Sequence, residues 1–361
     1  MKILFIAPIP PPITGHSKCD QELYNHLKIE NDIKIVNLSK NNFKNGKFEI
    51  TRALQIMKIF FLILKYKRKI DIVYLTISQS LAGNLKDLII YLLLYNKLSN
   101  TYIHLHGGAI KKNLFDTNKV IYKINSFFYN KLAGVIVLGQ SHKEIFKSQV
   151  TEDKMFIVNN FYESIYLLDT TQINNKYSLI KSNKIKVLFL SNMQLEKGYN
   201  HILDSINHLN TIESNKFEFH FAGKFDNVSE EINFKTKINN SDNIFFHGFI
   251  DGKIKKQLLN ESHLLCLPTE FLEGQPVSII EAYASGLVVL APLTGGIIDI
   301  FSDANGFPIY SNSISIANTL KKVLSQKEEL HKIAIFNNAF AQKNFKIDYH
   351  LNKINNILKT K

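Results

Sequence analysis

Two carboxylates flank the start of an expected helix in the second half of the chain. The segment FLEGQPVSIIEA, residues 271–282, holds Glu273 ahead of that helix and Glu281 inside it. Pro276 suits the first position of a helix and Gly286 suits its end, so the helix should cover about 276–285. Because the first N–H groups of a helix have no acceptor within it, they can bind a phosphate.

The spacing of these residues fits a ligand with a phosphate in its middle. Val277 and Ser278 would offer N–H groups, and Glu281 follows Val277 by one helical turn, a rise of about 5.4 Å, similar to the step from a nucleotide's phosphate to its ribose hydroxyls. Glu273 would lie on the other side, near whatever the phosphate carries, and carboxylates accept hydrogen bonds well from hydroxyls. The alternatives are a solvated helix face for Glu281 and an ordinary acidic residue at a helix start for Glu273.

The elements that would position these residues form two similar series. Short apolar runs alternate with helical patterns, which predicts parallel sheets covered on both faces. The first series of expected strands is 2–8, 33–38, 71–77, 101–107, 134–139 and 155–160, and the second is 185–191, 217–223, 243–249, 263–269 and 287–292. The predicted fold class is α/β, with two Rossmann-like doubly wound domains facing across a cleft.

The domain boundaries follow from the same pass along the chain. We expect an N-terminal domain over 1–165, a polar linker over 166–183, and a C-terminal domain over 184–335. The remaining residues, 336–361, should form a C-terminal helix that packs back on the first domain. Both domains open with a strand, a loop carrying glycine and a helix, and ligands bind at the carboxyl ends of such strands.

Charge and composition limit the possible partners. The chain of 361 residues carries a net charge of +13, of which residues 1–165 supply +11 through 23 Lys and Arg against 12 Asp and Glu. The basic amphipathic stretches 52–70 and 119–132 suggest an anionic membrane surface. Nucleic acid and a mere compositional bias toward Lys, Asn and Ile are the alternatives. The two distant cysteines suggest a reducing compartment, and we expect neither a secretory signal nor a transmembrane segment.

The frame PTEFLEGQPVSIIEAYASGLVVLAPLTGG around Glu273 and Glu281 resembles the signature of retaining GT-B glycosyltransferases of family four, the glycosyl transferases group 1. The resemblance runs from PPPITGHS near the start to GGIIDIFSDANG at 295–306. It implies an acceptor-binding, membrane-facing domain over 1–165 and a nucleotide-sugar-binding domain over 184–335. Within the latter, it implies that Glu281 holds the ribose of a nucleotide sugar and Glu273 the donor sugar's hydroxyls. It also implies that the amides of Gly274 and Gln275 contact the sugar, and those of Val277 and Ser278 the phosphate.

Three further motifs extend the resemblance. FLSNMQLEKG (189–198) is similar to the family's basic phosphate clamp: Lys197 matches, and Asn192 stands where the family has arginine. PPPITGHS (10–17) resembles its Pro and Gly loop, with Gly15 allowing the backbone to approach the pyrophosphate or the acceptor. HLHGG matches His106 to an active-site histidine near the donor sugar and leaves His104 a structural role. Without visible third and fourth ligands, these two histidines do not predict a metal site.

These observations lead to one functional hypothesis with several alternatives. We expect a cytoplasmic, metal-independent, retaining glycosyltransferase, peripheral on the inner face of the cell membrane and needing no cofactor. It would move a sugar, most simply from a UDP-sugar, to a lipid-linked or growing glycan, as in O-antigen, capsule or lipopolysaccharide synthesis. The chain contains no Asp-x-Asp triplet, Walker loop or G-x-G-x-x-G. The alternatives are a nucleotide-sugar epimerase of the same fold, a basic nucleic-acid-binding protein, and a non-catalytic homologue.

Overall fold

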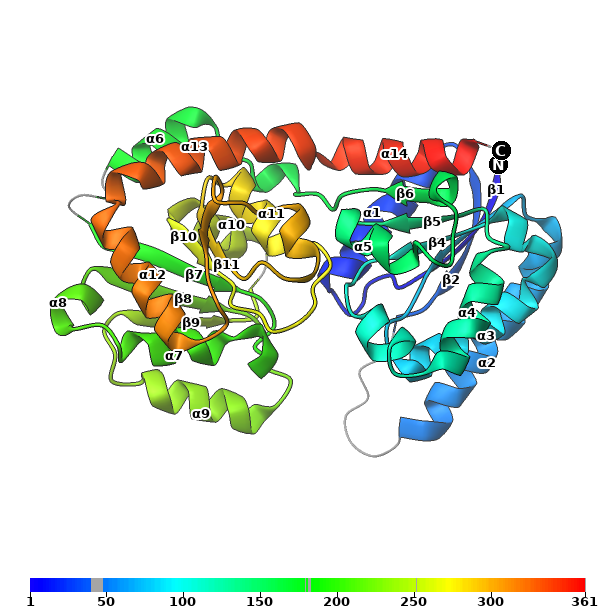
Figure 1. Cartoon of the computed structure of the whole chain (residues 1–361), viewed down its shortest axis with the longest axis horizontal. Helices are drawn as coiled ribbons and strands as arrows, with labels where there is room; N and C mark the ends of the chain where they lie inside the picture. Colours follow the sequence, from blue (N-terminus) through cyan, green and yellow to red (C-terminus); the bar gives the residue numbers. More distant parts are fainter. Residues whose placement is uncertain (40–47, 179, 181–182, 251, 361) are drawn as a thin grey trace. The chain divides into compact units, whose positions relative to one another are not determined.

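The computed structural model describes residues 1–39, 48–178, 180, 183–250 and 252–360, which form two compact units (Figure 1). Unit 1 consists of Met1–Asn160 and Asp348–Lys361, and unit 2 of Phe161–Ile347. Each unit is built on one parallel sheet of six strands. The predicted α/β class with two Rossmann-like domains is therefore confirmed.

The sheet of unit 1 has the strand order β2-β1-β3-β4-β5-β6. Its strands are β1 (Lys2–Ala7), β2 (Asp32–Asn37), β3 (Ile72–Thr76), β4 (Thr101–Leu105), β5 (Gly134–Val137) and β6 (Met155–Ile157). Its α-helices are α1 (Gly15–Leu27), α2 (Phe48–Tyr66), α3 (Leu81–Leu93), α4 (Lys119–Tyr129), α5 (Gln140–Phe146) and α14 (Ile347–Lys359). Every strand arises from a predicted apolar run. Most of these strands are buried on both faces, which leaves no room for polar alternation, whereas β2 has exposed Asp32, Lys34 and Asn37.

Alternate side chains of these strands face two different helical layers. Val73 and Leu75 of β3 belong to an apolar core with buried residues of α2, α3 and α4. Tyr74, between them, points to the other face and stacks on Phe5, which also contacts Tyr24 of α1. Figure 1 shows α2, α3 and α4 grouped on one side of the sheet and α14 on the other. The polar side chains of β3 and β4 described below lie on the face covered by α1 and α14.

Unit 2 repeats this architecture with the strand order β12-β11-β10-β7-β8-β9. Its strands are β7 (Ile185–Leu190), β8 (Phe217–Ala222), β9 (Ile244–Gly248), β10 (Leu264–Cys266), β11 (Val288–Ala291) and β12 (Gly306–Pro308). Its α-helices are α6 (Thr170–Ser178), α7 (Tyr199–Ile206), α8 (Thr211–Ser214), α9 (Val228–Ile238), α10 (Gly252–Glu261), α11 (Val277–Ala284), α12 (Ser313–Ser325) and α13 (Lys327–Asn344). The short strand β12 was not foreseen.

The segment expected to be a linker, 166–183, differs from that expectation because it contains α6 and belongs to unit 2. Lys176 donates from its ammonium group to the carbonyl of Ser285 at 2.7 Å, and Tyr177 donates from its hydroxyl to the carbonyl of Gly286 at 2.9 Å. Both acceptors follow α11, so α6 binds the carboxyl end of that helix. The polar sequence of α6 gave no sign that this helix packs on unit 2, because Lys176 and Tyr177 attach it through hydrogen bonds.

The end of the chain also differs from the single helix expected over 336–361. Two helices, α13 and α14, occupy this region, and the division between the units falls where α14 begins. The α14 helix belongs to unit 1, where Ile354 and Leu358 are fully buried. None of the helices formed by the described residues has both the length and the apolar character needed to cross a bilayer.

Candidate functional site

Glu273 lies in the loop that leads from β10 to α11 in unit 2. Its Oε1 atom accepts a hydrogen bond from the Lys197 ammonium at 2.5 Å and another from the Thr269 hydroxyl at 2.9 Å. The carboxylate stays 14% exposed. The structure thus brings together Glu273 and Lys197, which the sequence assigned to one donor site, and adds Thr269, which the sequence did not indicate.

Two glycines allow the neighbouring loops to approach this carboxylate. Gly198 has φ +80°, and a Cβ there would lie 2.1 Å from the carbonyl oxygen of Pro268. Gly295 has φ +55°, and a Cβ there would lie 2.8 Å from the carbonyl oxygen of Glu273. Both positions therefore exclude side chains through backbone conformation and through space. Any larger residue would push the Lys197 loop or the Gly295 turn away from Glu273.

The α11 helix begins next to Glu273, as predicted. Pro276 is its N-cap, so the helix begins at Val277, one residue later than expected. Val277 and Ser278 are partly exposed at the helix start, whereas Gly274 and Gln275 ahead of it are buried. The N–H groups of the first turn have no intrahelical acceptor and sit at the positive end of the helix dipole. The backbone donors of α11 therefore follow Glu273 closely in the chain, and Lys197 contacts Glu273 from another loop of unit 2.

Glu281 is buried on α11, with 2% of its surface exposed. The ammonium group of Lys255, on α10, lies 2.6 Å from its Oε1 and also 4.8 Å from the centre of the Tyr166 ring. Lys255 was missed in the sequence, because nothing in the α10 pattern distinguishes it from its exposed lysine neighbours. A carboxylate has two oxygens, each of which can accept hydrogen bonds.

Asn192, the other residue assigned to the phosphate clamp, is exposed in the loop after β7. Lys197 follows in the same loop, with its ammonium group 4.9 Å from the centre of the Phe271 ring. Lys197 is therefore the one positive charge within the motif at 189–198, where it follows the acidic Glu196.

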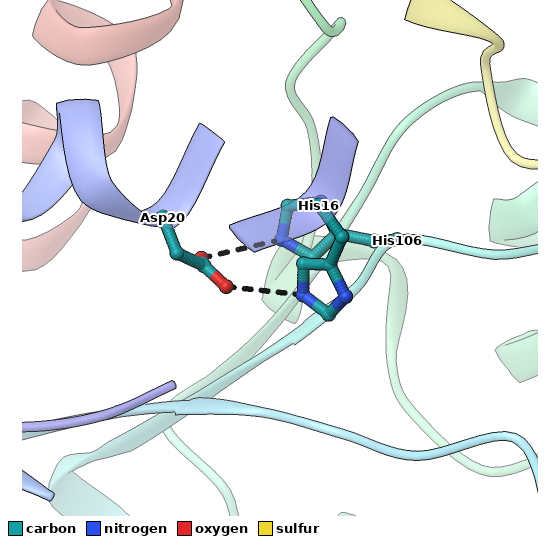
Figure 2. A group of neighbouring side chains, drawn as sticks. All are labelled: His16, Asp20 and His106. Atoms are coloured by element: carbon teal, nitrogen blue, oxygen red, sulfur yellow. Dashed lines mark ion pairs between the residues drawn. The ribbon is translucent and has the colours of Figure 1, made fainter. Parts of the chain in front are cut away.

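A second group of polar residues lies in unit 1, around Asp20 of α1. Its carboxylate is fully buried, and its Oδ2 lies 3.0 Å from Nε2 of His16, one turn earlier on the same helix. Its Oδ1 lies 3.6 Å from Nε2 of His106, which follows β4. Figure 2 shows both imidazoles turned toward this carboxylate, each with its Nε2 atom. The Tyr74 and Thr76 hydroxyls donate to it from β3, the tyrosine at 3.2 Å.

Further histidines continue this cluster along the α1 and α14 face of the sheet. The ring of His106 lies 4.1 Å from that of His16 and 3.9 Å from that of His104, between centres. His104 is fully buried on β4, with its Nδ1 atom 2.6 Å from the Tyr74 hydroxyl. His350 of α14 lies behind it, with Nδ1 2.7 Å from the carbonyl oxygen of Asn159.

The electrostatics of this cluster centre on one negative charge. Burial alone would raise the pKa of Asp20, but the charges and hydrogen bonds of His16 and His106 outweigh it and hold that pKa well below its usual range. Burial lowers the pKa of His104 strongly and that of His106 as well, where the charge of His16 adds to the effect and Asp20 opposes it. Burial lowers the pKa of His350 to about 4. At neutral pH, Asp20 is therefore ionised, and it lies near His104 and His106, whose pKa values are lowered by burial.

The sequence anticipated only part of this second group. Gly15 begins α1 and is exposed, preceded by Thr14, which caps the helix by exchanging hydrogen bonds with Ser17. His106 was assigned a role, but His16 and Asp20 were not. The available signal was their i, i+4 spacing at the start of a helix that follows a strand at the carboxyl edge of a sheet.

Known proteins resemble this chain in the sequence of unit 2 and in the fold of the whole chain. Residues 171–338 match the family model described as Glycosyl transferases group 1. HepE from Anabaena, solved with UDP and glucose, is similar over 100% of both chains at 17% identity, with a TM-score of 0.75. Sucrose-phosphate synthase from Thermosynechococcus elongatus is similar over 99% of this chain and 98% of its own at 12% identity, with a TM-score of 0.78.

WaaG, described as a glycosyltransferase involved in lipopolysaccharide biosynthesis, is similar over 99% of this chain and 100% of its own at 13% identity, with a TM-score of 0.71. A comparison with curated protein sequences found no match. The whole chain therefore has the fold of the GT-B glycosyltransferases. Unit 2 carries the match to the group 1 family, and the resemblance first drawn from Glu273 and Glu281 is confirmed.

Proposed function

We propose that this protein is a retaining glycosyltransferase that uses a nucleotide diphosphate sugar as its donor. The observation that carries the proposal is the arrangement of Glu273, Lys197 and the start of α11 within unit 2. Backbone N–H groups at a helix start and an ammonium group are donors that bind a diphosphate well. Glu273 supplies an acceptor for the hydroxyls of the sugar beside it.

The residues act mainly by position and charge. The N–H groups of Val277 and Ser278 and the ammonium of Lys197 stabilise the negative charge that grows on the leaving diphosphate. Glu281 accepts from the ribose hydroxyls, and the amides of Gly274 and Gln275 hold the donor sugar. The acceptor hydroxyl attacks from the side of the leaving group and passes its proton to a phosphate oxygen. We also assign His106 the role of an active-site histidine near the donor sugar, and we propose that the reaction needs no metal.

The direct test removes the two groups assigned to the donor sugar. Glu273→Ala and His106→Ala should lose transfer while circular dichroism shows both variants folded. Glu270→Ala is the matched control for the first, because Glu270 stands three residues earlier, is 53% exposed and pairs with His201. Near-normal turnover in both site variants would refute the proposed site.

The identity of the donor is proposed from the ligands of similar structures. HepE has been solved with UDP, with UDP-glucose and with UDP and glucose. We therefore propose a UDP-sugar. A ligand that binds only the folded chain raises its melting temperature, so thermal shifts with UDP-, GDP- and ADP-sugars should differ, with the largest for UDP. An equal shift with all three, or none, would argue against it.

The acceptor is proposed to be a lipid-linked or growing glycan of a surface polysaccharide, reached from an anionic membrane surface. Support comes from rows of exposed apolar side chains on the helices that cover one face of unit 1. These are Leu54, Met57, Phe61 and Leu64 on α2; Leu81, Leu85, Ile89 and Leu92 on α3; and Val120, Ile124 and Phe127 on α4. Exposed lysines accompany them, including Lys58, Lys65 and Lys123.

The sequence had left open whether the apolar residues of these helices are core or surface, and the structure divides them. Ile59 and Ile63 of α2 are buried in the core, while Met57 and Phe61 are 65% and 64% exposed. Exposed apolar residues beside lysines suit the boundary between lipid headgroups and acyl chains.

Flotation with liposomes tests this part of the proposal. Vesicles containing phosphatidylglycerol should bind the chain and release it at high salt, whereas neutral vesicles should bind it weakly. The double variant Met57→Ser and Phe61→Ser should bind less. Ile212→Ser and Val228→Ser in unit 2 form the control, since both residues are exposed there as well. Equal flotation of both double variants would remove α2 from the proposed membrane face.

A further inference from the structure

The cluster around Asp20 brings three metal-binding side chains together. One ring nitrogen of His16, one of His106 and a carboxylate oxygen of Asp20 all lie within 4.8 Å of one another. Two of the separations are 3.0 Å, from His16 to Oδ2, and 3.6 Å, from His106 to Oδ1. The residues come from α1 and from the end of β4, so the fold of unit 1 alone assembles them (Figure 2).

These separations match those of ligand atoms around a tetrahedral zinc ion. Zinc binds imidazole nitrogen and carboxylate oxygen at roughly 2.0 to 2.2 Å. At tetrahedral angles such bonds place neighbouring ligand atoms about 3.3 Å apart. The two observed values lie on either side of that distance but end on different oxygens, Oδ2 for His16 and Oδ1 for His106. One ion therefore takes both oxygens, or takes a single oxygen after a rotation of the carboxylate. We infer that His16, Asp20 and His106 form a binding site for a zinc-like divalent ion, with the fourth position open to a water or a ligand oxygen.

The surroundings of Asp20 resemble the second layer of a metal site. Thr76 donates its hydroxyl to Oδ2 at 3.3 Å, and Tyr74 donates to Oδ1 at 3.2 Å. Hydrogen bonds of this kind fix the orientation of a ligating carboxylate, and their loss typically weakens metal binding by about 10- to 100-fold. Thr76 and Tyr74 are both buried, which keeps this support rigid.

The ligand types select the class of ion. Two imidazole nitrogens with one carboxylate suit zinc and its neighbours among the divalent transition metals, whereas magnesium prefers a shell of oxygens. Metal binding requires a lone pair on each Nε2 atom, so any proton shared with Asp20 leaves or moves to Nδ1 when the ion enters.

Occupation of the site would have a consequence for the reaction. The ion would engage Nε2 of His106, the residue proposed to contact the donor sugar. Zinc should therefore inhibit transfer, and a chelator should restore it. The inference about binding itself does not depend on the proposed function, because it can be measured without any donor or acceptor.

The experiment is calorimetric titration of the full chain, stripped of metal, with Zn²⁺ and separately with Mg²⁺. Wild type should bind one Zn²⁺ and show no comparable Mg²⁺ step. Asp20→Asn and His16→Gln should weaken the Zn²⁺ step at least about 100-fold, more than the second-layer variant Thr76→Val at about 10- to 100-fold. His16 is 34% exposed on α1, so its variant remains informative should the buried Asp20→Asn chain not fold.

The control addresses the other imidazole pair, His220 and His247 in unit 2, whose ring nitrogens lie 3.1 Å apart. His247→Gln should leave the Zn²⁺ step unchanged. Cobalt gives a second readout, since a four-coordinate site produces strong visible absorption bands that His16→Gln should abolish. A Zn²⁺ step that survives in His16→Gln and Asp20→Asn, or that disappears in His247→Gln, would overturn the assignment, as would no Zn²⁺ step in wild type.

Discussion

The two units each hold a buried carboxylate beside their candidate sites, but they balance its charge differently. Glu281 of unit 2 faces the ammonium of Lys255, and Glu273 faces that of Lys197. Asp20 of unit 1 faces the imidazoles of His16 and His106. Unit 2 thus pairs its carboxylates with ammonium groups, whereas unit 1 surrounds its carboxylate with imidazoles, the side chains that most often bind metal ions in proteins.

The largest expected effect concerns the ammonium group of Lys197. Lys197→Met removes the ammonium that faces Glu273 and that, in the proposed reaction, stabilises the growing charge of the diphosphate, so kcat should fall by about 100- to 1,000-fold. Steady-state kinetics with a saturating donor measure it. Lys186→Met is the control, because Lys186 makes an ion pair with Glu261 away from these residues. A fall of less than tenfold would show that unit 2 does not rely on this charge.

The second prediction breaks the ion pair between Lys255 and Glu281. Lys255→Met leaves a buried carboxylate without its cation and should lower the free energy of unfolding by about 3 kcal/mol. The matched substitution Lys235→Met breaks an exposed helical pair with Glu231 and should cost less than about 1 kcal/mol. Urea unfolding of the two variants gives the comparison. Similar losses would mean that burial does not distinguish the two pairs.

The third prediction uses acid to probe the other carboxylate. The pKa of Asp20 is lowered in the folded chain relative to about 3.9 in the unfolded chain. The unfolded state therefore takes up the proton first as pH falls, so this contribution is present above about pH 4 and is lost below it. Asp20→Asn should flatten the decline of unfolding free energy in that window. Asp32→Asn, at an exposed pair with Lys34, should leave it nearly unchanged.

An acid profile of Asp20→Asn as steep as that of wild type would show that other carboxylates govern the acid stability of unit 1.

The smallest effect tests the helix that carries His16 and Asp20. Thr14→Ala removes the N-cap of α1 and should cost about 1 kcal/mol of stability. Thermal unfolding followed by circular dichroism measures the loss. Thr14→Ser keeps the capping oxygen and should restore most of it. Equal losses for alanine and serine would mean that the cap does not hold α1 in place.

The sequence revealed the site of unit 2 far better than the cluster of unit 1, for a physical reason. Glu273, Val277 and Glu281 belong to one stretch of chain, so helix geometry alone sets their spacing. Asp20, Thr76 and His106 come from α1, β3 and the end of β4, and only the sheet order β1-β3-β4 brings them together. No local pattern records such an encounter between separate segments.

The fold followed the same rule. Apolar runs predicted the long strands, because burial on both faces requires continuous hydrophobicity. The α6 helix escaped notice because much of its attachment to unit 2 uses Lys176 and Tyr177, which bond to backbone carbonyls. Lys255 escaped for a similar reason, since its partner Glu281 lies 26 residues away along the chain.

The path of the chain through the two units has a consequence for how each can be made. Unit 2 is one uninterrupted segment, and the N–H of Tyr162 donates to the carbonyl of Phe345 at 3.1 Å, so its two ends adjoin. Unit 1 consists of two segments, and α14, whose Ile354 is buried, covers one face of its sheet. On the ribosome, residues 161–347 emerge before α14, so the face of the unit 1 sheet that α14 covers stays uncovered until that helix has been made.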